Sequence, residues 1–276
     1  MICDYHTHTS FSDDSVYEME NCINDAIESG IDEICFTDHV DYGIKNDWDM
    51  YRAGKADKEM LNVDYVRYFS EIDKMVEKYG DKIKIKKGLE FGVQSHTISD
   101  YEKLVSKYNL DFVIMSIHRI DNKGFWSGDF QKGKTEPEYY RVYYDEMYNL
   151  VRNFHEYNVL GHMDLIKRYD DKDGYDSFSA NRDIIEKILR YIIEDGKGIE
   201  LNASTEKYGI SELMPSKEIL SLYHKLGGRI ITIGSDSHSK KDIERVNIKK
   251  FMNELKKIGF EEFCTFENMK PIFHRL

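Results

Sequence analysis

Short apolar runs alternate with longer stretches of helical periodicity along the whole chain. Apolar runs rich in β-branched residues predict strands, and apolar residues recurring every three or four positions predict amphipathic helices. The predicted strands span residues 2–5, 33–37, 83–89, 112–117, 159–160, 198–201 and 229–233. The predicted helices span residues 16–27, 63–79, 99–107, 138–155, 184–192, 216–226 and 240–256. This β-then-α order favours parallel strands joined by crossover helices, in an open doubly wound sheet or a barrel slightly short of eight units.

Two long segments follow the second and fourth predicted strands, at residues 41–62 and 119–136. Loops of this length in a compact domain usually carry a function, and both contain aromatic and charged residues. The chain has 3 prolines and no Gly/Ser-rich tract that would mark a linker. We therefore expect one domain over residues 1–276.

Composition excludes several classes of protein. The formal net charge of -12 disfavours a nucleic-acid partner, because a phosphate backbone is met by clustered Lys and Arg. The N-terminus lacks the basic region and apolar run of a signal peptide, and no segment approaches the ~18 apolar residues that span a bilayer. The 4 cysteines form no CxxC pair, which indicates buried free thiols. We expect a soluble, cytoplasmic protein without a membrane partner, and the sequence carries no prediction of oligomeric state.

Histidine or carboxylate side chains follow six of the seven predicted strands. The carboxyl ends of parallel strands face one side of an α/β fold, where ligands bind. Imidazole and carboxylate are the ligands expected for zinc, iron or manganese. The side chains at these strand ends, which predict a metal site, are His6, His8, His39, Glu90, His118, His162, Asp236 and His238.

The spacing of His6 and His8 is the sharpest local signal. Residues two apart on an extended chain point the same way, so both imidazoles can reach one ion. Asp236 and His238 repeat this spacing. A single histidine is more often an ordinary polar residue. We expect that role for the histidines away from the strand ends, which are His96, His155, His224 and His274.

Six short motifs occur in a characteristic order. They are HTH at 6–8, TDH at 37–39, GLEFG at 88–92, SIH at 116–118, GHMDL at 161–165 and GSDSH at 234–238. With these motifs the chain resembles the polymerase and histidinol phosphatase (PHP) superfamily, and most closely its stand-alone histidinol-phosphatase branch. The resemblance covers almost the whole chain. It implies a distorted seven-stranded (β/α) barrel, similar to a TIM barrel, with three metal ions at the carboxyl ends of its strands.

The resemblance also implies which side chains bind each ion. The first ion would be held by His6, His8, Glu90 and Asp236, and the second by His118, His162 and Glu90. The third would be held by His39, His238 and a residue shortly after the HTH motif. Relatives with a histidine six residues after that motif favour Asp14, whereas relatives with an SDG align better with Asp13. We favour Asp14, although Asp13 could also be a solvated turn residue or a helix cap.

Hydrolysis of a phosphomonoester needs a nucleophile and neutralisation of the charge on the phosphoryl oxygens. A metal ion lowers the pKa of bound water from 15.7 towards ~7. We expect that a hydroxide bridging the two ions joined by Glu90 attacks phosphorus, while the third ion binds a phosphate oxygen and the leaving-group side. Asp236 and His238 could assist proton transfer, but a side chain already bound to metal is a poor acid, which favours a metal-bound water as the proton source. The predicted catalytic residues are therefore Glu90, Asp236 and His238.

Basic residues near the strand ends are candidates for phosphate contact. A guanidinium suits bidentate recognition of phosphate, so Arg168 is preferred over Lys167 and Arg119. Acidic and aromatic residues of the long segments would suit a substrate that carries an imidazole and an amine. Candidates of this kind are Asp41, Tyr42 and Trp126.

The resemblance implies a metal-dependent phosphoric monoester hydrolase that acts on L-histidinol phosphate in histidine biosynthesis, with three divalent ions of zinc, iron or manganese. Because one scaffold supports several activities, another small phosphomonoester or a nucleotide is the alternative substrate. PHP domains that serve as non-catalytic modules typically have lost metal ligands. The ligand set of this sequence is intact, which disfavours such a role. A related amidohydrolase would carry a lysine at a strand end, for which the chain offers no clear candidate.

Overall fold

The computed structural model describes residues 1–170 and 175–276. Within them, seven parallel strands lie in the order β1-β2-β4-β5-β8-β9-β10. Their bounds are β1 (Cys3–Thr7), β2 (Glu33–Phe36), β4 (Lys84–Gly92), β5 (Phe112–Ser116), β8 (Val159–Leu160), β9 (Gly198–Asn202) and β10 (Ile231–Gly234). The segment after β10 returns to β1, because Thr7 pairs with Ser237 and the amide of His8 donates to the Ser237 carbonyl at 2.9 Å. The predicted (β/α) barrel with seven strands is confirmed, and it is nearly closed.

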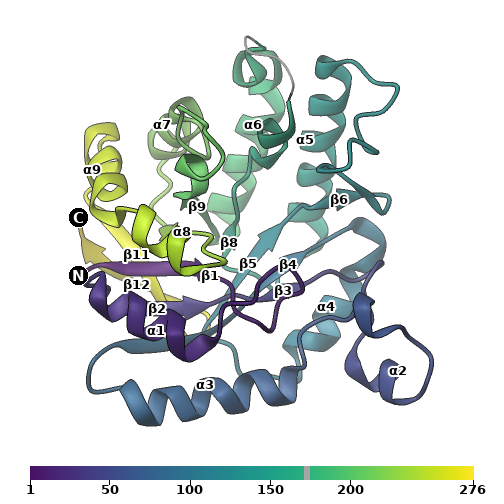
Figure 1. The fold of residues 1–276 in the computed structure, drawn as a ribbon. Coiled ribbons are helices and arrows are strands. Elements are labelled where there is room, and N and C mark those ends of the chain that lie inside the picture. The colour runs from purple at the N-terminus through teal and green to yellow at the C-terminus, as the bar shows by residue number, and fades with distance from the viewer. Residues whose placement is uncertain (171–174) are drawn as a thin grey trace.

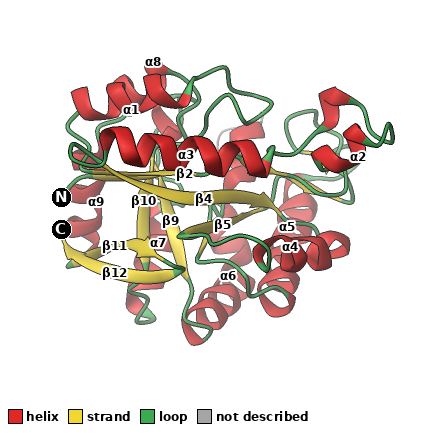
Figure 2. Cartoon of the chain, turned by 90° about the horizontal axis from the view of Figure 1, so that it is seen from below, coloured by secondary structure: helices red, strands yellow, loops and turns green. Residues whose placement is uncertain are grey.

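Helices surround this barrel (Figure 1). Their bounds are α1 (Met19–Glu28), α2 (Trp48–Arg52), α3 (Tyr65–Tyr79), α4 (Ile98–Val105), α5 (Glu136–Asn153), α6 (Ser177–Glu194), α7 (Lys217–Lys225), α8 (Lys240–Arg245) and α9 (Ile248–Ile258). Helix α3 illustrates the packing, since Tyr65, Tyr68, Ile72 and Met75 recur at helical spacing and are all buried. Figure 2 shows α3 lying alongside β2 and β4, and the Tyr68 hydroxyl donates to the carbonyl of Gly88 in β4 at 3.1 Å.

Three predicted helices differ from the structure by more than two residues. The helix predicted over 184–192 is α6, which begins at Ser177. The helix predicted over 16–27 is α1, which begins at Met19, and Val16 is exposed. The single helix predicted over 240–256 is two helices, α8 and α9, with a break at Val246 and Asn247. The side chain of Asn247 accepts a hydrogen bond from the amide of Lys250, so it caps α9 and begins a new helix.

The structure contains several short elements that the apolar pattern does not predict. Two-residue strands are β3 (His39–Val40), which pairs with β4, and the hairpin of β6 (Arg119–Ile120) and β7 (Lys123–Gly124). Short 3-10 helices are η1 (Lys58–Met60), η2 (Ser95–Thr97), η3 (Leu165–Tyr169) and η4 (Ser204–Glu206). These elements matter for the site because β3 and β6 begin at His39 and Arg119.

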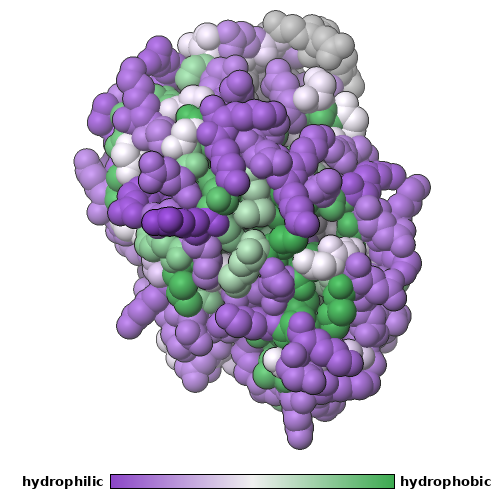
Figure 3. Space-filling view, turned by 90° about the vertical axis from the view of Figure 1, so that its left-hand side faces the viewer, coloured by the Kyte–Doolittle hydropathy of each residue, from purple (hydrophilic) through white to green (hydrophobic). Residues whose placement is uncertain are grey.

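A hairpin of β11 (Glu262–Glu267) and β12 (Lys270–Arg275) ends the chain beside β1. The Tyr5 ring packs against Phe112 and Phe266, and the amide of Phe266 donates to the Tyr5 hydroxyl at 2.8 Å. Both chain ends lie on this side of the molecule, and Figure 3 shows apolar atoms reaching its surface between hydrophilic side chains. Within the described residues, no helix is both long and apolar enough to cross a membrane.

Strand β1 shows how the barrel places chemistry inside. All five of its residues are buried, and successive side chains point to opposite faces. Tyr5 lies on the outer face, against the terminal hairpin. Asp4 and His6 lie on the inner face, where Asp4 accepts hydrogen bonds from the amides of Ser235 and His6. The inner face of β1 therefore carries polar side chains to the carboxyl end of the barrel.

Candidate metal centre

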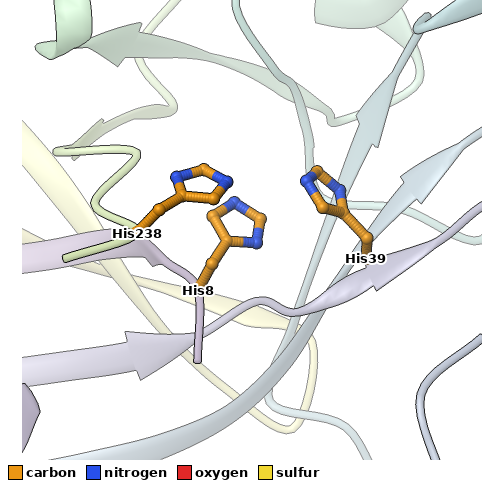
Figure 4. A group of neighbouring side chains, drawn as sticks. All are labelled: His8, His39 and His238. Atoms are coloured by element: carbon orange, nitrogen blue, oxygen red, sulfur yellow. The ribbon is translucent and has the colours of Figure 1, made fainter. Parts of the chain in front are cut away.

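The nine predicted metal ligands lie close together at the carboxyl ends of the barrel strands. His6 and Glu90 lie within β1 and β4, His39 begins β3, and the others follow strands directly or lie in the loop after β1. The complete set is His6, His8, Asp14, His39, Glu90, His118, His162, Asp236 and His238. Figure 4 shows the imidazole of His8 between those of His39 and His238, with each neighbouring pair of ring centroids 4.2 Å apart.

Glu90 lies at the centre of this group. Its carboxylate has 0% exposure and lies within 3.5 Å of five imidazoles. Oε1 lies 2.9 Å from His162 Nε2 and 3.1 Å from His118 Nε2. Oε2 lies 3.2 Å from His6 Nε2, 3.5 Å from His8 Nε2 and 2.9 Å from His39 Nδ1. This position allows one carboxylate to join two neighbouring ions.

Asp236 follows β10, which lies next to β1 where the barrel closes, and its amide donates to the carbonyl of His6 at 2.8 Å. Its Oδ1 lies 3.8 Å from His6 Nε2 and 3.6 Å from His8 Nε2. The residue has a positive φ of 56°, which is uncommon for a side chain other than glycine and is typical of functional sites. The other oxygen, Oδ2, accepts a hydrogen bond from Arg168 at 2.8 Å. One oxygen of Asp236 therefore faces the histidines and the other is held by a guanidinium.

The two acidic residues after the HTH motif lie in different surroundings. Asp14 Oδ2 lies 3.4 Å from His39 Nε2 and 3.1 Å from His238 Nε2. Asp13 instead accepts a hydrogen bond from Lys45 Nζ at 2.7 Å. The structure therefore places Asp14 beside the two histidines predicted for the third ion.

Several buried polar atoms of the centre have no hydrogen-bond partner among the described residues. They are His6 Nε2, His8 Nε2, His39 Nδ1, His162 Nδ1 and Glu90 Oε2. An unsatisfied buried polar atom costs about 1–3 kcal/mol, so such a concentration needs an explanation. Four overlapping sets of three side chains also place possible ligand atoms within 4.8 Å of one another. This arrangement fits divalent metal ions, which bind imidazole nitrogen and carboxylate oxygen.

The ionisation of the centre also fits a cation. Burial alone would raise the pKa of Glu90, but the surrounding histidines outweigh it and hold the pKa well below its usual value. Burial alone would lower the pKa of His6, but the carboxylates of Glu200 and Glu90 raise it well above its usual value. For His8, burial and the imidazoles on either side keep the pKa well below its usual value. Carboxylates that stay ionised beside a neutral imidazole are suitable metal ligands.

Three carboxylates outside the predicted set support the histidines. Glu200 lies 2.5 Å from His6 Nδ1, and Asp41 lies 2.9 Å from His118 Nδ1. Asp38 accepts a hydrogen bond from the Ser12 hydroxyl, which in turn lies 3.3 Å from His8 Nδ1. Hydrogen bonds to the second ring nitrogen orient metal-binding histidines in many proteins. The sequence signal for Glu200 was a charged residue inside an otherwise apolar strand.

A pocket of about 400 Å³ opens above the centre, and some of the candidate substrate contacts line it. Arg168 lines it, but its guanidinium donates to Asp236 and Ser204 and lies over the ring of Tyr208. Arg119 also lines it and makes no ion pair with any residue that the structure describes. Its guanidinium lies 4.1 Å from the centroid of the Trp126 ring. Arg119 is therefore the more available of the two cations.

Three of the four other candidate substrate contacts are engaged in hydrogen bonds within the protein. Lys167 Nζ donates to Asp164 and to the carbonyl of Leu213, at 2.7 and 2.6 Å. Asp41 accepts a hydrogen bond from Lys45, and the Tyr42 hydroxyl donates to Asp47. Trp126 lines the pocket and is 53% exposed. Among the loop candidates, Trp126 is thus the one with a free face.

The remaining histidines lie away from the centre. His96 is exposed, and His155 pairs with Asp195 on the surface. His224 packs against the ring of Phe260, and His274 lies 2.8 Å from the Thr265 hydroxyl. These positions agree with surface and packing roles.

Comparisons with known proteins identify the family. Residues 4–204 match the PHP domain family. The chain belongs to the PHP family. A histidinol-phosphatase from Lactococcus lactis is 35% identical over 269 residues, which cover 97% of this chain and 95% of that protein. A protein of Clostridium acetobutylicum named "Probable histidinol-phosphatase" is 32% identical, over 99% of this chain and 96% of that protein.

A solved structure supports the PHP fold along the whole chain. The crystal structure of histidinol phosphate phosphatase from Lactococcus lactis, complexed with zinc, L-histidinol and phosphate, matches with a TM-score of 0.84. It is 32% identical in sequence, and the match covers 98% of each chain. The predicted resemblance to the PHP superfamily and to its histidinol-phosphatase branch is therefore confirmed.

Proposed function

We propose that this PHP protein is a histidinol-phosphatase, which hydrolyses L-histidinol phosphate to L-histidinol and phosphate in histidine biosynthesis. The observation that carries the proposal is the buried Glu90 carboxylate surrounded by five imidazoles, several of which have a nitrogen without a hydrogen-bond partner. The similarity to histidinol-phosphatases along nearly the whole chain supports the same conclusion. Residues 1–276 would then form one metal-dependent phosphatase domain.

The centre would hold three divalent ions. The first would be bound by His6, His8, Glu90 and Asp236, the second by His118, His162 and Glu90, and the third by Asp14, His39 and His238. Distances of 3.8 Å or less between the facing atoms of these side chains support the grouping. Among zinc, iron and manganese, zinc has the support of the Lactococcus lactis complex.

Divalent ions bound there would supply a hydroxide nucleophile near neutral pH and neutralise charge on the phosphoryl oxygens. The side chains of this chain determine where that chemistry takes place. Glu90 would bind both of the first two ions, and Asp236 would complete the first site from the segment next to β1. His238 would join Asp14 at the third ion, and both side chains line the pocket.

Arg119 and Trp126 would receive the substrate. A guanidinium with no carboxylate partner can donate two parallel hydrogen bonds to phosphate, so Arg119 is better placed for this role than Arg168. Trp126 offers an exposed aromatic face at the pocket, suited to the imidazole of a cationic substrate. The substrate would be a small phosphomonoester that the pocket of about 400 Å³ can accept.

The test is phosphate release by protein whose metal content is measured by mass spectrometry. Histidinol phosphate should be hydrolysed faster than a panel of sugar phosphates, aryl phosphates and nucleotides. Removal of metal by a chelator should abolish release, and added zinc, iron or manganese should restore it. A metal-replete protein that leaves histidinol phosphate intact but cleaves another member of the panel would contradict the substrate and keep the reaction class.

A further inference from the structure

Strand β9 supplies none of the predicted metal ligands, yet it places two polar side chains beneath them. Glu200 and Asn202 both have 0% exposure. A buried carboxylate without a basic partner is rare, and Glu200 pairs with no lysine or arginine among the described residues. Its contacts are instead His6, the amide of His162 and the side-chain amide of Asn202.

The contact with His6 determines which ring nitrogen faces the centre. Glu200 Oε1 lies 2.5 Å from Nδ1 of His6, while Nε2 of the same ring lies 3.2 Å from Glu90. An ionised carboxylate only accepts hydrogen bonds, so it keeps the proton of a neutral imidazole on Nδ1. The lone pair of Nε2 is then directed toward Glu90 and Asp236, where a cation would bind.

The second oxygen of Glu200 holds a different part of the centre. Oε2 accepts a hydrogen bond from the backbone amide of His162 at 2.9 Å. This contact fixes the chain directly after β8, from which the His162 ring reaches Glu90 at 2.9 Å. In the proposed assignment, His6 and His162 would bind the two different ions that Glu90 joins. One buried carboxylate therefore contacts a residue from each of the two sites.

Two glycines leave the space that these contacts require. A Cβ at Gly234 would lie 2.5 Å from Glu200 Oε1 and 2.3 Å from the Cβ of His6. A Cβ at Gly161 would lie 2.5 Å from the hydroxyl of Ser116, which donates to Glu90. The backbone around Glu200 is thus packed so closely that larger residues would displace His6 or the support of Glu90.

We propose that Glu200 is a positioning residue shared by the two metal sites that Glu90 joins. This proposal rests on the proposed function only for the assignment of His6 and His162 to those sites. Its carboxylate holds the His6 tautomer with one oxygen and the start of the His162 loop with the other. Asp14, His39 and His238 make no contact with Glu200, so the third site should be independent of it.

The deciding variant is Glu200→Gln. The three partners of the carboxylate, at His6, His162 and Asn202, all donate hydrogen bonds, but an amide has only one oxygen, so at least one donor would face an N–H group. We expect zinc affinity at the paired sites to fall roughly 10- to 100-fold, as for other residues that support metal ligands, while one site keeps its affinity. Zinc affinity is measured by competition with a chromophoric chelator, and stoichiometry by mass spectrometry.

The matched control is Glu33→Gln. Glu33 is also a buried barrel carboxylate at 2% exposure, but it begins β2 at the opposite end of the barrel and accepts from the Tyr5 hydroxyl. It should leave zinc affinity unchanged. A second variant, Glu200→Asp, keeps the charge but is one methylene too short to reach His6 and His162 together. It should weaken the same two sites, and it serves as the test if the glutamine variant does not fold.

A spectroscopic readout separates positioning from a general loss of structure. In zinc-loaded protein labelled with ¹⁵N-histidine, long-range ¹H–¹⁵N spectra report the protonated nitrogen of each ring. The His6 signals should change in the Glu200 variants and the His238 signals should not. Wild-type zinc affinity together with unchanged His6 signals would overturn the proposal. None of these measurements needs a substrate, so the result holds even where wild-type protein leaves histidinol phosphate intact.

Discussion

Asp14 Oδ2 lies 3.1 Å from Nε2 of His238, although one residue follows the first strand of the barrel and the other follows the last. The barrel brings them together because β1 and β10 are neighbours where it closes. The adjacent Asp13 points elsewhere and pairs with Lys45. Two neighbouring carboxylates thus have separate roles, which their order in the sequence does not reveal.

The first prediction concerns this pair of acidic residues. Asp14→Ala should remove one of the three proposed ions, because only His39 and His238 would remain to bind it. Bound zinc per protein, measured by mass spectrometry after dialysis, should fall from about three to about two, with phosphate release greatly reduced. Asp13→Ala is the control and should keep all three ions, since Asp13 contacts Lys45 rather than the histidines. Loss of an ion from the Asp13 variant alone would reverse the assignment.

The second prediction separates the two arginines of the pocket. Arg119→Met should raise KM for a phosphomonoester roughly 10- to 100-fold, the equivalent of one charge-assisted hydrogen bond of about 1.5–3 kcal/mol. Metal content should not change, because Arg119 contacts Trp126 and none of the predicted ligands. Arg168→Met should instead weaken zinc binding, because Arg168 holds Asp236 at 2.8 Å. Steady-state kinetics and zinc titration of both variants test these roles. Weaker zinc binding in Arg119→Met, together with a raised KM and unchanged zinc binding in Arg168→Met, would contradict them.

Much of the barrel could be predicted from the sequence because each strand is a compact apolar run. The convergence of the proposed ligands follows from the fold, because parallel strands end on one side, so residues such as His6 and His162 meet without any local signal of contact. Short elements could not be predicted in this way. Strand β3 has two residues, and its pairing with β4 depends on the neighbouring chain rather than on its own apolar pattern.

The supporting side chains were harder to predict than the ligands. Glu200 lies in a strand that lacks a histidine, and its partner His6 is distant along the chain, so no spacing rule connects them. From the sequence, Asp41 is only an acidic residue in a long loop, and such a residue suits contact with a substrate amine. Its actual partners, His118 and Lys45, become clear only when the barrel places the loop after β3 beside the end of β5.

The third prediction concerns pH and metal removal. In metal-free protein, burial alone would lower the pKa of His118, but Glu90 and Asp41 outweigh it and raise the pKa to about 9. The unfolded value is near 6.5, so the stabilisation from protonated His118 is fully present below about pH 6.5 and is lost as the pH rises to about 9. Chemical denaturation of metal-free protein should show falling stability across this window, and His118→Asn should flatten the change. An unchanged pH profile in that variant would contradict the role of His118.

Metal binding should show the same linkage from the other direction. A bound imidazole must be neutral, so a histidine that is protonated at pH 7 has to release its proton when a cation arrives. Zinc titration by calorimetry in buffers of different ionisation enthalpy should therefore detect net proton release at pH 7. The released amount should decrease as the pH approaches 9, and it should be smaller in His118→Asn than in the wild type. Uptake of protons would refute the prediction.

The fourth prediction concerns Gly92 at the end of β4. A Cβ there would lie 2.0 Å from Asp41 Oδ1 and 2.7 Å from His118 Nδ1, so Gly92→Ala would force these two side chains apart. Overpacking of this kind typically costs about 1–3 kcal/mol of stability. Because His118 would lose its orienting carboxylate, zinc affinity should also fall, by roughly 10- to 100-fold. Thermal unfolding and zinc titration measure the two effects separately.

Gly30→Ala provides the comparison for the Gly92 variant. Gly30 has a φ of 75° and no atom within 4 Å of an added Cβ, so alanine there strains the backbone without crowding any side chain. It should lower stability by a similar amount, about 1–2 kcal/mol, but leave zinc affinity at the wild-type value. A Gly92 variant that loses stability only, with unchanged zinc affinity, would mean that His118 keeps its orientation without Asp41. Loss of affinity in Gly92→Ala alone would instead identify the Asp41 contact as the one that holds His118 for metal binding.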